Sequence, residues 1–158
     1  MLPHVITYLV TTLSPAELVD VYDTRLLLER EATWLGSARL DRAAGEQMRR
    51  QHSRMREAVE AGQRAEALDS DEKLLTILYV ASGNAVLVDL IHSLWQRCRP
   101  YKLVGIEGAA THADPAVWSF QGPLIDAAAH HDVSAAVAIT ERSLISATAR
   151  IKSMLDGG

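Results

Sequence analysis

The residue with the clearest potential for chemistry is Asp71, a carboxylate inside an otherwise apolar helical segment. Residues 71–84 read DEKLLTILYVASGN, and Asp71, Leu75 and Leu78 are spaced so that they share one helical face. A carboxylate that faces a core is costly unless another group pairs with it or a ligand uses it. Asp71 is therefore either half of a structural ion pair or part of a polar site.

A second candidate is Arg25, which lies on an apolar face of the segment LVDVYDTRLLLEREA, one helical turn before Glu29. Under one interpretation it is the structural ion-pair partner of Asp71 or Glu29. Under the other, its guanidinium holds the carboxylate or phosphate of a bound molecule through paired hydrogen bonds. The sequence leaves both interpretations open.

Motifs for catalysis are lacking throughout the sequence. There is no glycine-rich phosphate loop, no nucleophile elbow and no pair of histidines at the spacing of a zinc-protease helix. His130 and His131 are neighbours that point about 100° apart, and we interpret them as cations near a helix C-terminus. His92 is either a satisfied boundary residue or part of a pocket wall. We therefore predict no catalytic residues and no enzyme activity.

Composition bounds the class of protein. The 158 residues carry a formal net charge of -4, and 48% of them are hydrophobic, which suits one domain with a proper core. The acidic balance lacks the basic footprint of an autonomous nucleic-acid binder. Cys98 is the single cysteine, which fits a reducing cytoplasm and precludes an intrachain disulfide. The apolar runs are too short to cross a bilayer, and the N-terminus lacks the basic start of a signal peptide.

Helical periodicity dominates the chain after a short extended arm. Residues 5–10, VITYLV, are β-branched and aromatic and predict a strand or arm. Ser14, Pro15 and Glu17 form a capping box with proline at the first helical position, which predicts a helix over residues 14–39. Two further helices are expected, over residues 41–61 and 65–82.

Prolines and small residues shape the second half of the chain. A helix begins after Asn84 and reaches about Arg99, where Pro100 must break it or kink it into residues 101–106. The elements expected next are a loop over residues 105–111, a cap at Asp114-Pro115, a helix from Pro123 to His130 and a last helix from Asp132 to Leu155. The sequence thus predicts an all-α antiparallel bundle of six to seven helices.

Three groups of residues stand in an order that suggests a family. They are Arg25-x-x-x-Glu29, Asp71 twelve residues before Gly83-Asn84, and the stretch PLIDAAAHHDVSAAVAI, in which Asp132 is the cap. Their order and spacing over residues 13–155 resemble the FCD domain, the C-terminal effector-sensing half of the FadR branch of GntR-type bacterial transcription regulators. The family counterparts are an R-x-x-L-E helix, the same aspartate-to-Gly-Asn distance and the segment I-x-x-A-I-x-x-G-D-x-x-x-A.

The resemblance implies an effector-binding and dimerisation domain over residues 14–158, with residues 1–13 as an N-terminal arm or linker. Most FCD domains hold a divalent metal with one aspartate and three histidines. Asp71 matches the aspartate, but the histidine positions fall on Leu75, Gln121 and Ser143. Because leucine has no donor and Gln and Ser are weak ligands, we expect no metal and no other cofactor.

The resemblance therefore points to the metal-free subset of the family, which includes the fatty-acid regulator that binds acyl-CoA within this bundle. The expected effector is a small organic acid or an acyl thioester, bound by Arg25, Asp71, Leu75, Gln121 and Ser143. If Asp71 is structural instead, we expect Arg25 or Gln121 to satisfy its carboxylate. An effector site would be an enclosed cavity bounded by these side chains.

Partners follow from the same resemblance. It implies a homodimer, with the helices over residues 14–39 and 85–99 as the candidate face and Trp34, Trp95 and Trp118 as core or dimer anchors. DNA would be bound only through a winged-helix domain, which the thirteen residues before Ser14 cannot form. The chain is thus expected to be a piece of a regulator or a free-standing sensor, without a membrane partner. The alternatives are a degenerate bundle that only dimerises, and an unrelated helical enzyme or adaptor domain.

Overall fold

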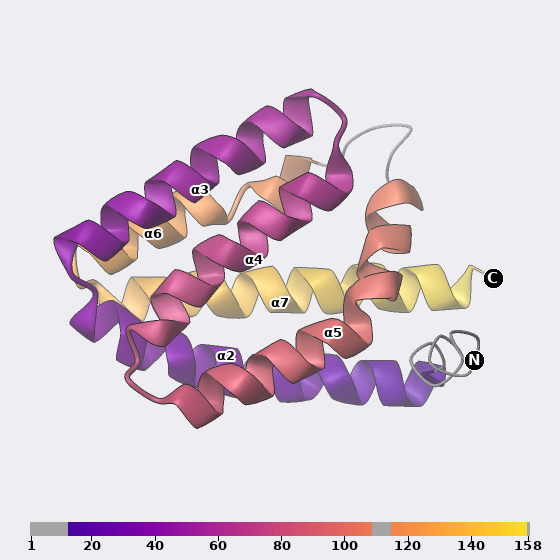
Figure 1. Ribbon diagram of the computed structural model, residues 1–158. Coiled ribbons are helices and arrows are strands. Elements are labelled where there is room, and N and C mark those ends of the chain that lie inside the picture. Colours follow the sequence, from indigo (N-terminus) through magenta and orange to yellow (C-terminus); the bar gives the residue numbers. More distant parts are fainter. Residues whose placement is uncertain (1–12, 109–114, 158) are drawn as a thin grey trace, which may run out of the picture.

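The computed structural model describes residues 13–108 and 115–157, which form six α-helices and one 3-10 helix, with no strand in those ranges (Figure 1). The elements in chain order are α2 (Pro15–Arg39), α3 (Arg42–Glu60), α4 (Arg64–Val80), α5 (Ala85–Gly108), η1 (Pro115–Trp118), α6 (Gln121–Ala129) and α7 (Val133–Asp156). The prediction of an all-α bundle is confirmed. The strand or arm expected at residues 5–10 and the cap expected at Asp114 lie outside the described residues.

The helix starts follow the local signals in the sequence. Ser14 Oγ accepts a hydrogen bond from the Glu17 amide at 3.1 Å, and the Glu17 side chain accepts one from the Ser14 amide, as a capping box requires. Asp41 and Asp132 cap α3 and α7 by accepting from backbone amides three residues on. Gly83 ends α4 with a φ of 74°, a left-handed conformation that glycine adopts without strain.

Two helix boundaries near prolines differ from those expected: the start of α6 and the end of α5. Helix α6 begins at Gln121 rather than at Pro123, because a proline in the first helical turn replaces an N–H that would have no partner there. Pro100 kinks α5 without ending it, and the helix continues to Gly108. Residues 105–108, which were expected to begin a loop, therefore belong to α5.

Helices α2 and α7 run antiparallel and side by side, and α4 crosses the middle of the bundle with α3 and α6 beyond it (Figure 1). The hydroxyls of Thr33 and Thr140 share a buried hydrogen bond of 2.9 Å at the α2–α7 contact. Gly36 lets α2 approach α4 closely, since a Cβ at this position would overlap the backbone carbonyl of Leu78. This tight crossing brings side chains of α2, α4 and α7 around a common interior space.

None of the helices in the described part of the chain combines the length and hydrophobicity that crossing a bilayer requires.

Candidate functional site

A cavity of about 70 Å³ lies inside the bundle. Its walls come from α2, α4, α5, η1, α6 and α7. All five residues proposed from the sequence line it, namely Arg25, Asp71, Leu75, Gln121 and Ser143. Since a buried water needs about 10–15 Å³ of such space, the cavity in this conformation has room for a few waters or a small molecule.

Asp71 and Gln121 form one buried pair at this cavity. The Gln121 Nε2 donates to Asp71 Oδ1 at 3.0 Å and to the Val117 carbonyl at 3.3 Å. The prediction named Arg25 or Gln121 as the partner of the Asp71 carboxylate, and the structure shows Gln121 in that role. Because Nε2 lies between two acceptors, the other amide atom must be oxygen. That Gln121 Oε1 is buried and has no hydrogen-bond partner among the described residues, so it can accept from a bound hydroxyl, amine or water.

Burial raises the pKa of Asp71, because the low-dielectric interior disfavours the carboxylate. The charge of Lys102, the hydrogen bond from Gln121 and the charge of Arg25 each act in the opposite direction, without cancelling the effect of burial. Asp71 thus holds its proton to a higher pH than an exposed aspartate does.

This raised pKa predicts how stability depends on pH. The protonated Asp71 favours folding below the ordinary pKa of aspartate, and this contribution is lost as the pH rises through the folded-state pKa. We expect the Asp71→Asn variant, which has no such proton, to gain stability relative to wild type as the pH rises. Urea unfolding across acidic to mildly alkaline pH measures the difference.

The matched control for that experiment is Asp126→Asn, because the Asp126 side chain is 63% exposed and lies outside the cavity. The burial argument for Asp71 fails if Asp71→Asn and Asp126→Asn show the same pH dependence.

Arg25 is held by a second buried group. Its Nε donates to Glu29 Oε2 at 2.7 Å, and Tyr79 Oη donates to Glu29 Oε1 at 2.9 Å. The guanidinium also lies over the Tyr22 ring and has one nitrogen 3.6 Å from Cys98 Sγ. Of the two ion-pair partners considered from the sequence, Glu29 is therefore the one that Arg25 contacts. Burial, and then the charge of Glu29, raise the pKa of Tyr79 well above its usual value.

Two cations at the cavity were not among the residues proposed from sequence. Arg150 stands seven residues after Ser143 on α7, so helical periodicity could have placed it on the same face. Lys102 lies beyond the kink at Pro100, whose direction no sequence pattern gives. With them the described side chains of the lining comprise three cations, Arg25, Lys102 and Arg150, and two carboxylates, Glu29 and Asp71. An anion therefore suits the cavity better than a cation.

The donor set at the four family metal positions does not fit a transition-metal ion. Leu75 offers no donor atom, and Gln121 offers only a neutral amide oxygen, which is a weaker ligand for a transition metal than the imidazole it replaces. Ser143 offers a neutral hydroxyl, which is a weak ligand. Across residues 13–108 and 115–157, no group of three or more His, Cys, Asp and Glu side chains is arranged to hold an ion.

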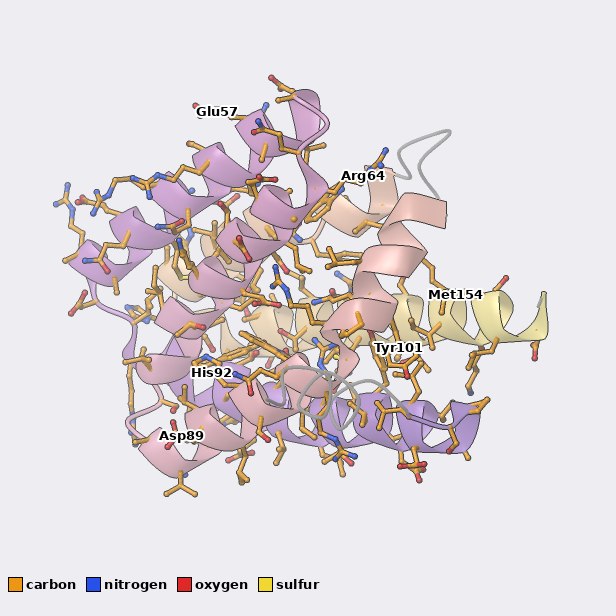
Figure 2. All side chains as sticks on the ribbon, turned by 45° about the vertical axis from the view of Figure 1, so that its right-hand side comes forward. Glu57, Arg64, Asp89, His92, Tyr101 and Met154 are labelled. Atoms are coloured by element: carbon orange, nitrogen blue, oxygen red, sulfur yellow. The ribbon has the colours of Figure 1, made fainter. Side chains whose placement is uncertain are left out.

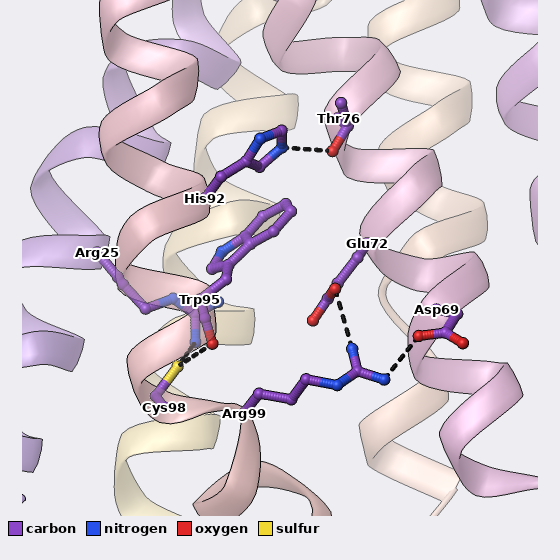
Figure 3. A network of polar contacts seen from close by, with 8 residues as sticks. All are labelled: Arg25, Asp69, Glu72, Thr76, His92, Trp95, Cys98 and Arg99. Atoms are coloured by element: carbon purple, nitrogen blue, oxygen red, sulfur yellow. Dashed lines mark hydrogen bonds and ion pairs between the residues drawn. The ribbon is translucent and has the colours of Figure 1, made fainter. Parts of the chain in front are cut away.

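His92 lies away from this cavity. It shares a 2.9 Å hydrogen bond with Thr76 and packs against Trp95 in a groove between α4 and α5 (Figure 3). It is therefore a satisfied boundary residue. His131 follows α6, and its ring nitrogen contacts the Ser37 carbonyl. Among the tryptophans, Trp95 is in the core and Trp118 lines the cavity, whereas Trp34 is 52% exposed and so is not a core residue.

The fold is a helical bundle with a cavity between its helices. The family model of the FCD domain matches residues 20–146. The chain therefore belongs to the FCD domain family, the effector-binding regulatory domain of GntR-type transcription regulators. The proteins that carry this domain are transcription regulators.

Two solved structures share this fold. Escherichia coli McbR/YncC aligns over 90% of this chain and 71% of its own, with a TM-score of 0.78 and 17% identity. Streptococcus agalactiae GntR aligns over 87% of this chain, with a TM-score of 0.70 and 19% identity, so this chain spans 60% of that regulator. No curated protein matches the chain.

Proposed function

We propose that residues 14–158 are the effector-sensing and dimerisation domain of a regulator in the FadR branch, and that a small carboxylate binds in the cavity without a metal. The observation that carries this proposal is the convergence of Arg25, Asp71, Gln121 and Ser143, from four different helices, on one cavity whose described side chains include more cations than carboxylates. A small carboxylate is favoured over an acyl thioester, because the free space in this conformation is only about 70 Å³.

Each wall of the cavity has a different role in this proposal. Lys102 and Arg150 attract the carboxylate, and Arg25 adds its charge from behind the Glu29 pair. Gln121 Oε1 accepts a hydrogen bond from a hydroxyl or amine of the effector. Leu75 and Leu124 contact its carbon skeleton. Residues 1–13 would connect this domain to a winged helix that binds DNA in the cytoplasm.

The mechanism would be a population shift. An effector that binds one arrangement of α2 and α5 better than another raises the population of that arrangement. In a dimeric regulator the same shift would change the separation of two DNA-binding heads, and so couple effector and DNA affinity.

Effector binding can be tested by native mass spectrometry and thermal melting with acetate, lactate, succinate, citrate, octanoate and octanoyl-CoA. An acid at a hundred times its Kd is expected to stabilise the domain by about 2.7 kcal/mol. Because a hydrogen bond to a charged group contributes about 1.5–3 kcal/mol, Lys102→Met is expected to weaken that acid about tenfold or more. Lys73→Met, which removes an exposed lysine of α4 outside the cavity, is the matched control.

The results separate the possible functions. A bound acid in the mass spectrum supports the sensor, and a bound metal ion contradicts the metal-free site. A bare dimer that no acid stabilises favours a bundle that only dimerises. That second candidate has support in the structure, because Arg25 and Asp71 already have protein partners.

The proposed dimer face is the outer side of α2 and α5. Leu27 and Trp34 on α2, and Val86 and Leu90 on α5, are each more than half exposed. The two helices pack against each other in antiparallel directions (Figure 1), and we take these four exposed side chains as parts of one face. Such exposed apolar groups suit burial against a second copy.

Leu90→Lys is expected to raise the dimer dissociation constant about tenfold or more, because a charge would replace an apolar contact near the centre of the interface. Ile145→Lys is the matched control, since Ile145 is 59% exposed on α7, outside this face. Analytical ultracentrifugation measures both variants. Equal effects of the two substitutions, or a monomeric wild type, would contradict the assigned face.

A further inference from the structure

The part of α5 beyond Pro100 stands between the cavity and the start of α2. Pro100 has no N–H to donate to the preceding turn, and Figure 1 shows the later part of α5 turning away from the line of its first part. Before the kink, Arg99 ties α5 to α4 through Asp69 Oδ1 at 2.6 Å and Glu72 Oε2 at 3.1 Å (Figure 3). The part of α5 before the kink is therefore attached to α4.

The first two residues beyond the kink contact different parts of the molecule. Lys102 lines the cavity, and its positive charge favours the ionised form of Asp71. Tyr101, which Figure 2 labels, packs against the cluster that contains Leu18 and Ile151. Neighbouring residues on a helix point about 100° apart, so this short segment can contact both places at once.

Tyr101 also holds the backbone at the start of α2. Its hydroxyl accepts from the Leu13 amide at 2.9 Å and donates to the Leu13 carbonyl at 3.3 Å. Leu13 is the residue just before the Ser14 cap of α2. A hydrogen bond of this kind weakens as its donor and acceptor separate or lose alignment.

We propose that Lys102 and Tyr101 form a relay that couples the charge in the cavity to the backbone at Leu13. The proposal deepens the proposed function, because the effector would act through the charge that it brings to Lys102. A change in that charge moves Lys102 and, with it, the segment of α5 after Pro100. The segment before Pro100 stays in place because Arg99 ties it to α4. The two hydrogen bonds from Tyr101 to Leu13 therefore lengthen or shorten. The hydrogen bonding of the backbone at the start of α2 thereby depends on the charge of the molecule in the cavity.

The relay can be tested without any effector, by substituting a charged group on another helix. Asp71→Asn removes the group whose ionised form attracts Lys102, and amide hydrogen exchange at Leu13 is compared with wild type by NMR at a series of pH values from acidic to mildly alkaline, so that the comparison includes the pH at which Asp71 ionises. Since one hydrogen bond contributes about 0.5–1.5 kcal/mol, we expect exchange at Leu13 to rise about two- to tenfold. In a Tyr101→Phe background, Asp71→Asn is expected to cause no further rise.

Asp126→Asn serves as the control, since it makes the same chemical change at an exposed site on α6. The relay is overturned if Asp71→Asn affects Leu13 no more than Asp126→Asn does, or if its effect persists in the Tyr101→Phe background. These outcomes do not depend on the acid panel, so a failure of effector binding and a failure of the relay are distinguishable.

Discussion

Gly36→Ala is expected to destabilise the domain by about 3 kcal/mol or more, because the added methyl group forces two helix backbones apart. A Cβ at Gly36 would overlap the carbonyl oxygen of Leu78, and the next nearest atom, the carbonyl carbon of the same residue, is 3.1 Å away. A backbone group cannot rotate aside as a flexible side chain does. Thermal melting is expected to show a fall in Tm of roughly 6–12 °C for a domain of this size.

Gly45→Ala is the matched control, because Gly45 is also a buried helical glycine. The Cβ there would meet only the Leu40 side chain, at an ordinary contact distance of 3.8 Å. Alanine should therefore stabilise α3 by about 0.5–1 kcal/mol through its helix propensity. A Gly36→Ala variant as stable as Gly45→Ala would show that α2 and α4 are not packed as described.

The second large effect is expected for Arg25→Met, at about 3–5 kcal/mol, because it leaves the carboxylate of Glu29 buried without its cation. Arg25 is 3% exposed and Glu29 is 1% exposed, so solvent cannot replace the missing charge. Urea unfolding of the purified variant at neutral pH measures the loss.

The double variant Arg25→Met/Glu29→Gln identifies the cause. The amide oxygen of the new glutamine still accepts from Tyr79 and carries no charge, so the double variant should recover most of the lost stability. If both variants lose the same amount, the effect comes from the packing of Arg25 and its contact with the Tyr22 ring rather than from an unpaired carboxylate.

The features that were predictable from the sequence are those that local chemistry determines. The capping box at Ser14, the caps at Asp41 and Asp132 and the glycine end of α4 depend on residues within one helical turn. The meeting of Arg25, Asp71, Gln121 and Ser143 at one cavity was predictable from family spacing. Their role in binding an effector stays a prediction.

The features that were missed depend on tertiary geometry. Lys102 reaches the cavity only because α5 turns at Pro100 in one particular direction. Gln121 begins a helix two residues before the proline that was expected to start it, because a proline costs little within the first turn. Trp34 is an apolar side chain on the outer face of α2, and its exposure follows from which neighbours α2 has rather than from its own residue type.

The single thiol of the sequence has a practical consequence. Cys98 is buried at the contact of α5 with α2, beside the Arg25 guanidinium. Alkylating reagents reach a buried thiol only when its surroundings open. The rate at which iodoacetamide modifies the protein therefore measures how often the packing of α2, α5 and α7 around Cys98 opens, without any engineered label. When the same reaction is followed by mass spectrometry in the presence of each acid, the alkylation rate of Cys98 shows whether that acid slows the opening of the bundle.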